Sequence, residues 1–360
     1  MCRLTLLGLL AASACGFEVR GPQGGDDTPD VDGAPADCAA ANWRDAAWTA
    51  RYPLSIQKAR VRGTPGDLAV LLAITSAELK QATASGDDIV ITTGDGTTVL
   101  PSEIERFEVA TGALLAWVRV PALSNAADTP LYLYFANPTP PAPPPGDVWP
   151  GYIAVWHFRE DPGAAVGQAR DSSTHGRHAT VQNMTSADRV AGKIGTAFNF
   201  DGIDNGLVLS PFVFPNRFTY EAWIRPTTLA GYHTVFDVAG NTRWLGLAAD
   251  KLEFYDGGDH VFDPPITGNA WHAIAAAYDG LKVHAYLDGT EIPTAPALTL
   301  ATVTSPLQIG FSKLGEHFLG SIDEARIHGA ALSADAIGTS YANISSPDRF
   351  ITVGSIEHCR

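Results

Sequence analysis

The chain has 360 residues, of which 45% are hydrophobic and 18% are charged, and its formal net charge is −15. The apolar share excludes a wholly disordered chain, and the acidic balance argues against nucleic acid as a partner, because a phosphate backbone needs a basic surface. The 35 glycines and 25 prolines favour many turns between short strands over long helices. The composition therefore indicates an acidic, β-rich protein that works outside the cytoplasm.

The chain begins with the pattern of an export signal. Arg3 is followed by an apolar run that ends at Ala12 and is too short to span a bilayer. Small residues then precede Cys15, and this pattern resembles the lipobox of bacterial lipoproteins, whose cysteine is acylated and becomes the mature N-terminus. The alternative is an ordinary secretory signal that is cleaved just before the cysteine. We expect a signal peptide over residues 1–14 and lipidation at Cys15.

The residues after the signal predict where the protein is held. In enteric bacteria an Asp after the cysteine tends to retain a lipoprotein in the inner membrane, whereas this chain has Gly16. The resemblance therefore implies a lipid anchor in the bilayer of the bacterial outer membrane, with the protein facing the periplasm or the cell surface. Residues 15–37 are rich in Gly, Pro and Asp, which predicts a flexible acidic tether.

The remaining cysteines lie at the two ends of the folded region. Cys38 stands at its start, and Cys359 is the penultimate residue of the chain. In an oxidising compartment we expect a Cys38–Cys359 disulfide that joins these ends. The alternative is two free buried thiols.

A proline-rich run at 138–145 divides the folded region, because proline cannot donate to a sheet ladder. We expect a linker over 138–150, domains over 38–137 and 151–345, and a C-terminal tail over 346–360. Before the linker, short runs between turn signals predict at least six strands of a β-sandwich. These runs are residues 51–56, 68–72, 88–92, 107–109, 117–120 and 131–135.

Five motifs stand in order in the first domain. They are Trp48-x-x-Arg51, Asp87–Thr92 followed by Asp95-Gly96, Glu103-Ile-Glu105, Trp117-Val-x-Val-Pro121 and Leu131–Asn137. Over residues 43–137 this order resembles a bacterial domain family of unknown function that often directly precedes a laminin-G-like domain. The resemblance implies an architecture and no mechanism, because the family has no established chemistry.

The sequence of the second domain predicts about eleven short strands with Asp-Gly turns. This pattern is typical of an antiparallel jelly roll of two packed sheets. A short helix is expected near 333–341, with Ser333 as its N-cap. The motifs of the second domain include Val155-Trp-His-Phe158, Phe200-Asp-Gly202, Phe218–Ile224, Trp271-His272 and Gly320-x-Ile-Asp-Glu-Ala-Arg-Ile327. They resemble the laminin-G-like, concanavalin A-like jelly-roll superfamily. We therefore predict an all-β protein with an N-terminal β-sandwich and a C-terminal concanavalin A-like jelly roll.

The sequence lacks the usual catalytic motifs. Retaining glycoside hydrolases of this fold carry E-x-D-x-E on one strand. With Asp323 as the central residue, this pattern requires Glu at positions 321 and 325, but the chain has Ser321 and Ala325 there. There is no H-E-x-x-H, no G-x-S-x-G elbow and no phosphate-binding loop. We expect no catalytic residues and no enzymatic activity, with a carbohydrate-active enzyme as the alternative.

The resemblance also implies a calcium site, because jelly rolls of this superfamily often bind calcium near the sheet rim. Ca²⁺ takes six to eight oxygen ligands, and the candidates here are Asp171, Asp201, Asp204 and Asp323. The alternative is that Asp201 holds a turn and that Asp323 pairs with Arg326 or with backbone amides.

An exposed aromatic platform with adjacent polar side chains is the usual device for binding a glycan. The candidates lie between residues 231 and 263, and they are Tyr232, Trp244, Tyr255, Asp259 and His260. The alternative is that these aromatic rings belong to the core. We predict a non-catalytic recognition protein that binds carbohydrate, or an envelope or extracellular protein, through the second domain. A purely structural envelope protein is the competing hypothesis.

Overall fold

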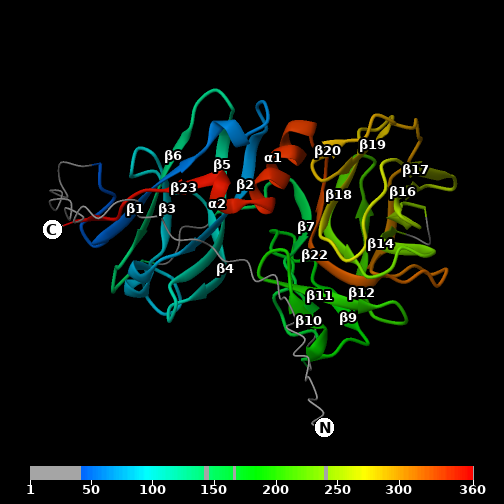
Figure 1. Ribbon diagram of the computed structural model, residues 1–360, viewed down its shortest axis with the longest axis horizontal. Coiled ribbons are helices and arrows are strands. Elements are labelled where there is room, and N and C mark those ends of the chain that lie inside the picture. The colour runs from blue at the N-terminus through cyan, green and yellow to red at the C-terminus, as the bar shows by residue number, and fades with distance from the viewer. Residues whose placement is uncertain (1–41, 142–145, 165–167, 239–241, 360) are drawn as a thin grey trace, which may run out of the picture.

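The computed structural model describes residues 42–141, 146–164, 168–238 and 242–359. The predicted signal peptide, the lipidation site Cys15, the acidic tether and Cys38 lie outside the described residues. The described chain forms two β domains that lie side by side along the longest axis of the molecule (Figure 1). Among the residues described, no helix is long and apolar enough to cross a membrane.

The first domain is a sandwich of two antiparallel sheets, which confirms the predicted fold class. One sheet has the order β23-β1-β6-β3, with β24 also paired to β1, and the other has the order β2-β5-β4. Alternate side chains of both sheets meet in one core that includes Ile56, Leu72 and Leu133. The elements are β1 Ala50–Ile56, η1 Lys58–Arg60, β2 Gly66–Thr75, η2 Ala77–Gln81, β3 Val90–Thr93, β4 Ser102–Glu108, β5 Ala113–Leu123, β6 Thr129–Phe135, β23 Ile351–Val353 and β24 Glu357–His358.

The end of the chain returns to the first domain. β23 pairs with the second half of β1, and β24 pairs with its first two residues. Residues 346–360, which the sequence suggested as a tail, therefore hold two strands of the first domain, and the second domain is inserted between β6 and β23. Cys359 is disulfide-bonded. Its predicted partner Cys38 lies outside the described residues, so that pairing stays a prediction.

The second domain is the expected jelly roll of two packed antiparallel sheets. The outer sheet has the order β17-β16-β15-β14-β21-β12-β9-β8, and the helix-facing sheet has the order β10-β11-β22-β13-β18-β19-β20, with β7 also paired to β22. Aromatic and branched side chains such as Phe200, Tyr220 and Phe254 fill the space between them. The strands are β7 Tyr152–Trp156, β8 Gln168–Ala169, β9 Ala179–Gln182, β10 Arg189–Ala191, β11 Thr196–Asp201, β12 Gly206–Phe214, β13 Phe218–Pro226, β14 Tyr232–Val238, β15 Trp244–Ala248, β16 Lys251–Tyr255, β17 Asp259–Phe262, β18 His272–Tyr278, β19 Val283–Leu287, β20 Thr290–Glu291, β21 Val303–Ile309 and β22 Leu319–His328, and a short turn of 3-10 helix, η3, spans Ser186–Asp188.

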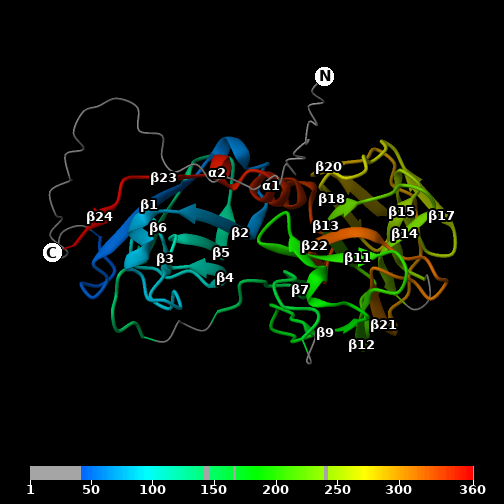
Figure 2. The ribbon, with the colours of Figure 1, turned by 60° about the horizontal axis from the view of Figure 1, so that its bottom comes forward.

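Helix α1 (Ala334–Ser345) lies between the two domains (Figure 2) and is followed by the short α2 (Pro347–Phe350). Ser333 caps α1 as predicted, because its hydroxyl accepts a hydrogen bond from the Ala336 amide. The Asn343 side chain accepts from the Leu71 amide at 2.7 Å and donates to the Leu71 carbonyl at 3.0 Å. Because Leu71 belongs to β2, α1 joins the jelly roll to the first domain through a backbone-like pair of hydrogen bonds.

Candidate functional site

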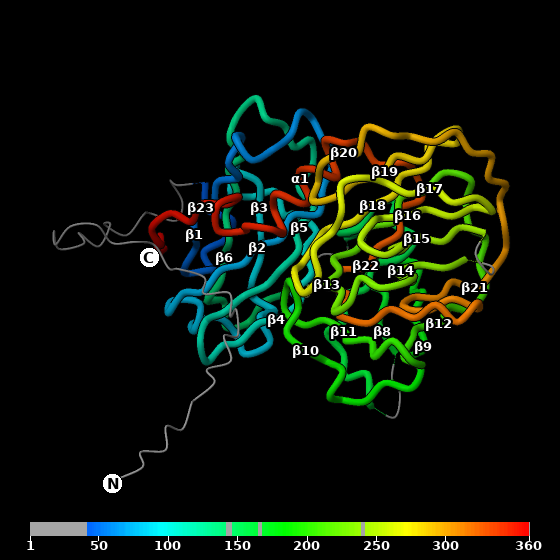
Figure 3. Tube along the Cα trace, turned by 45° about the vertical axis from the view of Figure 1, so that its right-hand side comes forward, coloured from blue at the N-terminus to red at the C-terminus, as the bar shows by residue number. Residues whose placement is uncertain are grey.

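A hollow of about 210 Å³ lies on the solvent-facing side of the outer sheet. We call it the outer-face pocket. Strands β14 to β17 form its floor, and the loop between β21 and β22 forms one wall. These strands lie at the end of the molecule that is far from the first domain (Figure 3). The lining residues are Tyr232, Trp244, Glu253, Tyr255, Asp259, Leu314 and Glu316.

The register of the strands brings the floor residues together. Trp244 pairs with Tyr255, and Tyr255 pairs with Asp259, so the three lie in one row across β15, β16 and β17. Their neighbours along the strands, including Leu245 and Phe254, belong to the core. Because side chains alternate between the two faces of a strand, the row of three points outward.

Trp244 lies across the floor of the pocket because Gly246, the next residue on the same face of β15, has no side chain. A Cβ at Gly246 would come within 2.5 Å of the indole ring and 2.2 Å of the His233 carbonyl oxygen. The indole nitrogen donates to the Thr234 hydroxyl at 2.8 Å, and that hydroxyl donates to the Glu316 carbonyl at 3.0 Å. This chain of hydrogen bonds ties the wall loop to the floor. Trp244 is only 2% exposed, so it is a floor and not a protruding platform.

Three of the lining residues are acidic. Glu253 is 2% exposed, and its Oε2 atom has no hydrogen-bond partner. Burial raises the pKa of Glu253 to about 7, and the nearby Asp259 and Glu316 carboxylates add to this rise. Glu316 is held in place by the Ser312 hydroxyl, which donates to its carboxylate at 3.1 Å. The pocket therefore combines aromatic side chains with an excess of negative charge.

The rim of the pocket is apolar and exposed. Tyr232 is 53% exposed and Leu314 is 71% exposed, and Val261, on the same face of β17 as Asp259, is 46% exposed. These three are half of the exposed large hydrophobic side chains of the described chain. Such a patch beside a hollow is typical of a surface that contacts a ligand.

The structure brings four of the five candidate glycan-binding residues together, namely Tyr232, Trp244, Tyr255 and Asp259. The fifth, His260, does not line the pocket. It points to the opposite side of β17 from Asp259, and its Nε2 lies 3.0 Å from Asp256. Sequence reasoning missed three lining residues, Glu253, Leu314 and Glu316.

The four candidate calcium ligands do not form one site. The buried Asp171 accepts hydrogen bonds from the backbone amides of Val155, Ser173 and Arg177, at 2.7 to 2.9 Å. Asp323 is fully buried and accepts from the amides of Ile194 and Glu324 at 2.9 and 2.8 Å. Their oxygens are thus used by the backbone, as the alternative for Asp323 anticipated.

Asp201 holds a turn, also as the alternative anticipated. One of its oxygens accepts from the amides of Ile203, Asp204 and Asn205. Although partial burial opposes it, these backbone donors lower the pKa of Asp201. Asp204 itself is exposed in this turn.

A second group of ionisable residues is buried where the two domains meet. We call Glu103, Glu105, His157, Glu324 and Arg326 the interdomain cluster. The two glutamates of β4 reach from the first domain, and the other three residues belong to the jelly roll. His157 Nδ1 lies 2.8 Å from Glu324, and the ring is within 4.0 Å of both β4 carboxylates. Arg326 forms an ion pair with Glu324.

Glu324 of this cluster lies in a β-bulge of β22. Between the pairs Trp223–Asp323 and Glu221–Arg326, β22 has one residue more than β13. Glu324, within the bulge, has a φ of 49°, in the left-handed region. Bulges of this kind redirect side chains, and here the result is that Asp323 and Glu324 are both buried.

The cluster is held together by a protonated histidine. Burial opposes the charge on His157, but the charge of Glu324 and its contact with Glu103 outweigh it and raise the pKa of His157 to about 10. Burial and the charge of Glu324 raise the pKa of Glu105 to about 7. The Trp117 indole donates to Glu105 at 2.8 Å, and its ring stacks on His157 at a centroid distance of 5.6 Å.

Among the residues that the structure describes, Glu105, His157 and Glu324 are the one group of three with metal-ligand spacing. Protonated His157 already pairs with the carboxylates of Glu105 and Glu324, and Arg326 lies directly beside Glu324. A divalent ion would have to displace that proton next to a guanidinium. The arrangement is therefore suited to joining the domains, and less suited to a metal.

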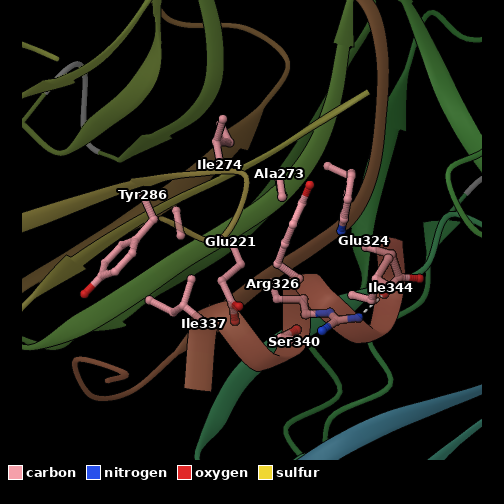
Figure 4. A pocket seen from close by; sticks show the side chains of 14 residues that line it. Glu221, Ala273, Ile274, Tyr286, Glu324, Arg326, Ile337, Ser340 and Ile344 are labelled. Carbon is pink, nitrogen blue, oxygen red and sulfur yellow. Dashed lines mark hydrogen bonds and ion pairs between the residues drawn. The ribbon is translucent and has the colours of Figure 1, made fainter. Parts of the chain in front are cut away.

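A cavity beneath α1 borders the same cluster (Figure 4). Glu221, Glu324 and Arg326 line it from the sheet, and Ile337 and Ser340 line it from the helix. Its volume is about 30 Å³, which is room for a water molecule but far below the ~300 Å³ of the smaller ligand pockets. It is a packing gap and not a ligand site.

Two family models match the chain. Residues 201–338 match the "Concanavalin A-like lectin/glucanases superfamily", and residues 85–149 match a "Domain of unknown function". The protein therefore carries an N-terminal domain of unknown function followed by a laminin-G-type, concanavalin A-like jelly roll, as the sequence predicted. No curated protein matches the chain.

Solved structures resemble about half of the chain. Domain 4 of an extracellular arabinanase from Geobacillus stearothermophilus, solved with arabinotriose, is 22% identical and has a TM-score of 0.42, with 53% of this chain and 98% of that chain covered. The binding domain of Paraclostridial Mosquitocidal Protein 1 is 14% identical, with a TM-score of 0.43 and coverage of 53% and 52%. The binding domain of botulinum neurotoxin serotype D is 13% identical, with a TM-score of 0.43 and coverage of 53% and 51%.

Proposed function

We propose that this protein is a non-catalytic, membrane-anchored recognition protein that binds carbohydrate through the outer-face pocket. The observation that carries the proposal is the convergence of three aromatic side chains and three carboxylates on one hollow. Aromatic rings offer stacking surface to a sugar, and carboxylate oxygens accept hydrogen bonds from hydroxyl groups. The volume of about 210 Å³ is below that of pockets for drug-sized ligands, which suits one sugar residue or a chain end.

The anchoring part of the proposal rests on the N-terminal sequence. Acylation of Cys15 would hold the protein in the bilayer of the outer membrane, where it would face the periplasm or the cell surface. More than one acyl chain is needed for stable anchoring. Incorporation of labelled fatty acid into the wild-type chain, but not into Cys15→Ala, is the expected result.

A carbohydrate-active enzyme is the second candidate, because Glu253 has a pKa of about 7 beside Asp259. A carboxyl group with a raised pKa beside a second carboxyl group is the arrangement of a general acid and its partner in glycosidases. The two candidates differ in product formation. Binding of a saccharide without release of reducing ends supports recognition, whereas release that is lost in Glu253→Gln supports the enzyme.

A glycan array tests the main proposal. The chain from residue 37 onward keeps every described residue and is applied with and without Ca²⁺. We expect saccharide binding that is lost in Tyr232→Ala, because this exposed ring forms the pocket rim. Leu281→Ala is the matched control, since Leu281 is 72% exposed and does not line the pocket. A blank array would favour a protein partner or a structural role.

A further inference from the structure

We infer that the outer-face pocket selects a cationic ligand, a sugar that carries an ammonium group and places it against Glu253. The inference rests on the proposed carbohydrate-binding function and names the ligand class of the same pocket. Three of the seven lining residues are acidic and none is basic. A neutral saccharide would leave this charge without a counter-ion, whereas an ammonium group would neutralise part of it.

The basic side chains near the pocket do not neutralise the negative charge of its acidic residues. Lys251 lies on the same strand as Glu253 but forms a 2.6 Å ion pair with Asp263. His260 faces the other side of its strand, 3.0 Å from Asp256. Burial lowers the pKa of His233, which keeps that ring neutral near pH 7. Lys313 is exposed in the wall loop and is not a lining residue.

Glu253 provides the specific contact. It is 2% exposed, it lines the pocket, and its Oε2 atom has no hydrogen-bond partner. A buried carboxylate oxygen without a donor is costly. An ammonium group has only donors, so it satisfies this oxygen. Asp259 and Glu316 lie close enough to act on the charge of Glu253 and would stabilise the same cation.

The surroundings favour an organic cation over Ca²⁺. Calcium needs six to eight oxygen ligands around one point. Glu253, Asp259 and Glu316 are not a group of metal-ligand spacing, since the described residues hold one such group and it lies in the interdomain cluster. The aromatic side chains Tyr232, Trp244 and Tyr255 offer calcium no carboxylate or carbonyl oxygen, but aromatic ring faces attract ammonium groups through cation–π interactions.

Isothermal titration calorimetry with a matched pair of ligands tests the inference. The pair is a glucosamine oligosaccharide and its N-acetylated form, which differ in the amino or acetamido substituent of each sugar residue and therefore in charge. We expect the amino form to bind the chain from residue 37 onward at least tenfold more tightly at about pH 6. Its binding should release close to one proton per site, because the ammonium group displaces the proton of Glu253 (pKa about 7). The N-acetylated form should release none.

Glu253→Gln is the decisive variant, because it keeps the shape of the side chain and removes its charge. We expect the preference for the amino form to fall at least tenfold and the proton release to disappear. Asp348→Asn is the control, since Asp348 is exposed on α2 and its replacement also removes one carboxyl group. A thermal midpoint of Glu253→Gln at or above that of the wild type shows that the variant is folded.

The outcomes separate this inference from the proposed function. Equal affinity for both saccharides, unaffected by Glu253→Gln, overturns the inference and leaves carbohydrate binding in place. If neither saccharide binds and the glycan array is blank, carbohydrate binding fails, and n-butylammonium becomes the probe. Binding of n-butylammonium to the wild type, but not to Glu253→Gln, then still supports a cation site. Absence of that binding, or Ca²⁺ binding at Glu253 in its place, overturns the inference.

Discussion

Replacing His157 by Phe is expected to weaken the contact between the two domains. Phe keeps an aromatic ring against Trp117 and Trp149, whose ring centroids lie 5.6 and 5.4 Å from that of His157. The substitution removes the positive charge from between Glu103, Glu105 and Glu324. These carboxylates would then face one another at the interface, with Arg159 and Arg326 as the remaining cations within reach of them.

The size of the effect follows from the pKa of His157. A rise from 6.5 to about 10 corresponds to at most ~5 kcal/mol, at ~1.4 kcal/mol for each tenfold change of the acid constant. Removing one member of a buried ion pair typically costs ~3–5 kcal/mol. Because two arginines remain near the carboxylates, we expect a loss of ~3 kcal/mol at about pH 7.

Calorimetric melting and chemical denaturation followed by tryptophan fluorescence measure this loss, since Trp117 and Trp149 lie against the ring. His284→Phe is the matched control. His284 also lies between two carboxylates, Glu291 at 2.7 Å and Asp279 at 3.6 Å, but on the surface. Exposed pairs contribute ~1 kcal/mol or less, so the control should melt close to the wild type.

The pH dependence identifies the cause. Because the folded pKa of His157 is raised, its stabilisation is fully present below about pH 6.5 and is lost as the pH rises through about 10. The stability difference between wild type and His157→Phe should therefore shrink above about pH 10. A difference below 1 kcal/mol at about pH 7, or one that stays constant up to about pH 11, would refute the argument from charge.

Three further predictions concern other parts of the molecule. Gly246→Ala should lower stability by ~1–3 kcal/mol and alter tryptophan fluorescence, since its Cβ would meet the His233 carbonyl at 2.2 Å; an unchanged spectrum and midpoint would contradict the described floor. EDTA should leave the thermal midpoint unchanged, because Asp171, Asp201 and Asp323 are held by backbone amides; a clear fall would restore the calcium site. A chain that ends at residue 345 should be cleaved rapidly within the first domain in limited proteolysis, because β1 loses both C-terminal partners; resistance equal to that of the full chain would count against this.

The sequence predicted the two β domains because the signal is local. Alternating apolar residues mark most strands, and the hydroxyl of Ser333 marks the start of α1. The same periodicity could have identified Glu253, which lies two residues before Tyr255 and therefore on the same face of β16. It would also have excluded His260 from the candidate glycan-binding residues, because His260 lies one residue after Asp259 and on the opposite face of β17.

The missed features depend on long-range contacts. Leu314 and Glu316 reach the pocket through the fold of a loop, which no spacing reveals. The interdomain cluster joins Glu105 to residues that are 52 and 219 positions away, His157 and Glu324. The motifs that contain these residues resemble two domain families, but nothing in either motif indicates that the two motifs lie in contact in the folded protein. The strands of the C-terminal segment are too short, at three and two residues, to stand out from a tail.

The insertion of the jelly roll into the first domain has a mechanical consequence. β1 pairs along its length with β6 on one side, and its two ends pair with β24 and β23 on the other. Strands β14 to β17, which form the floor of the outer-face pocket, lie at the opposite end of the molecule (Figure 1). If the chain is held upstream of β1 and pulled through a bound ligand, the tension runs along β1. Where this tension passes from β1 to β23 it loads their hydrogen bonds in shear, because the start of β23 pairs with the end of β1, at Ile351 and Ile56. Shear of this kind resists force better than peeling bonds one at a time, so we expect the first domain to resist unfolding when the chain is pulled in this direction.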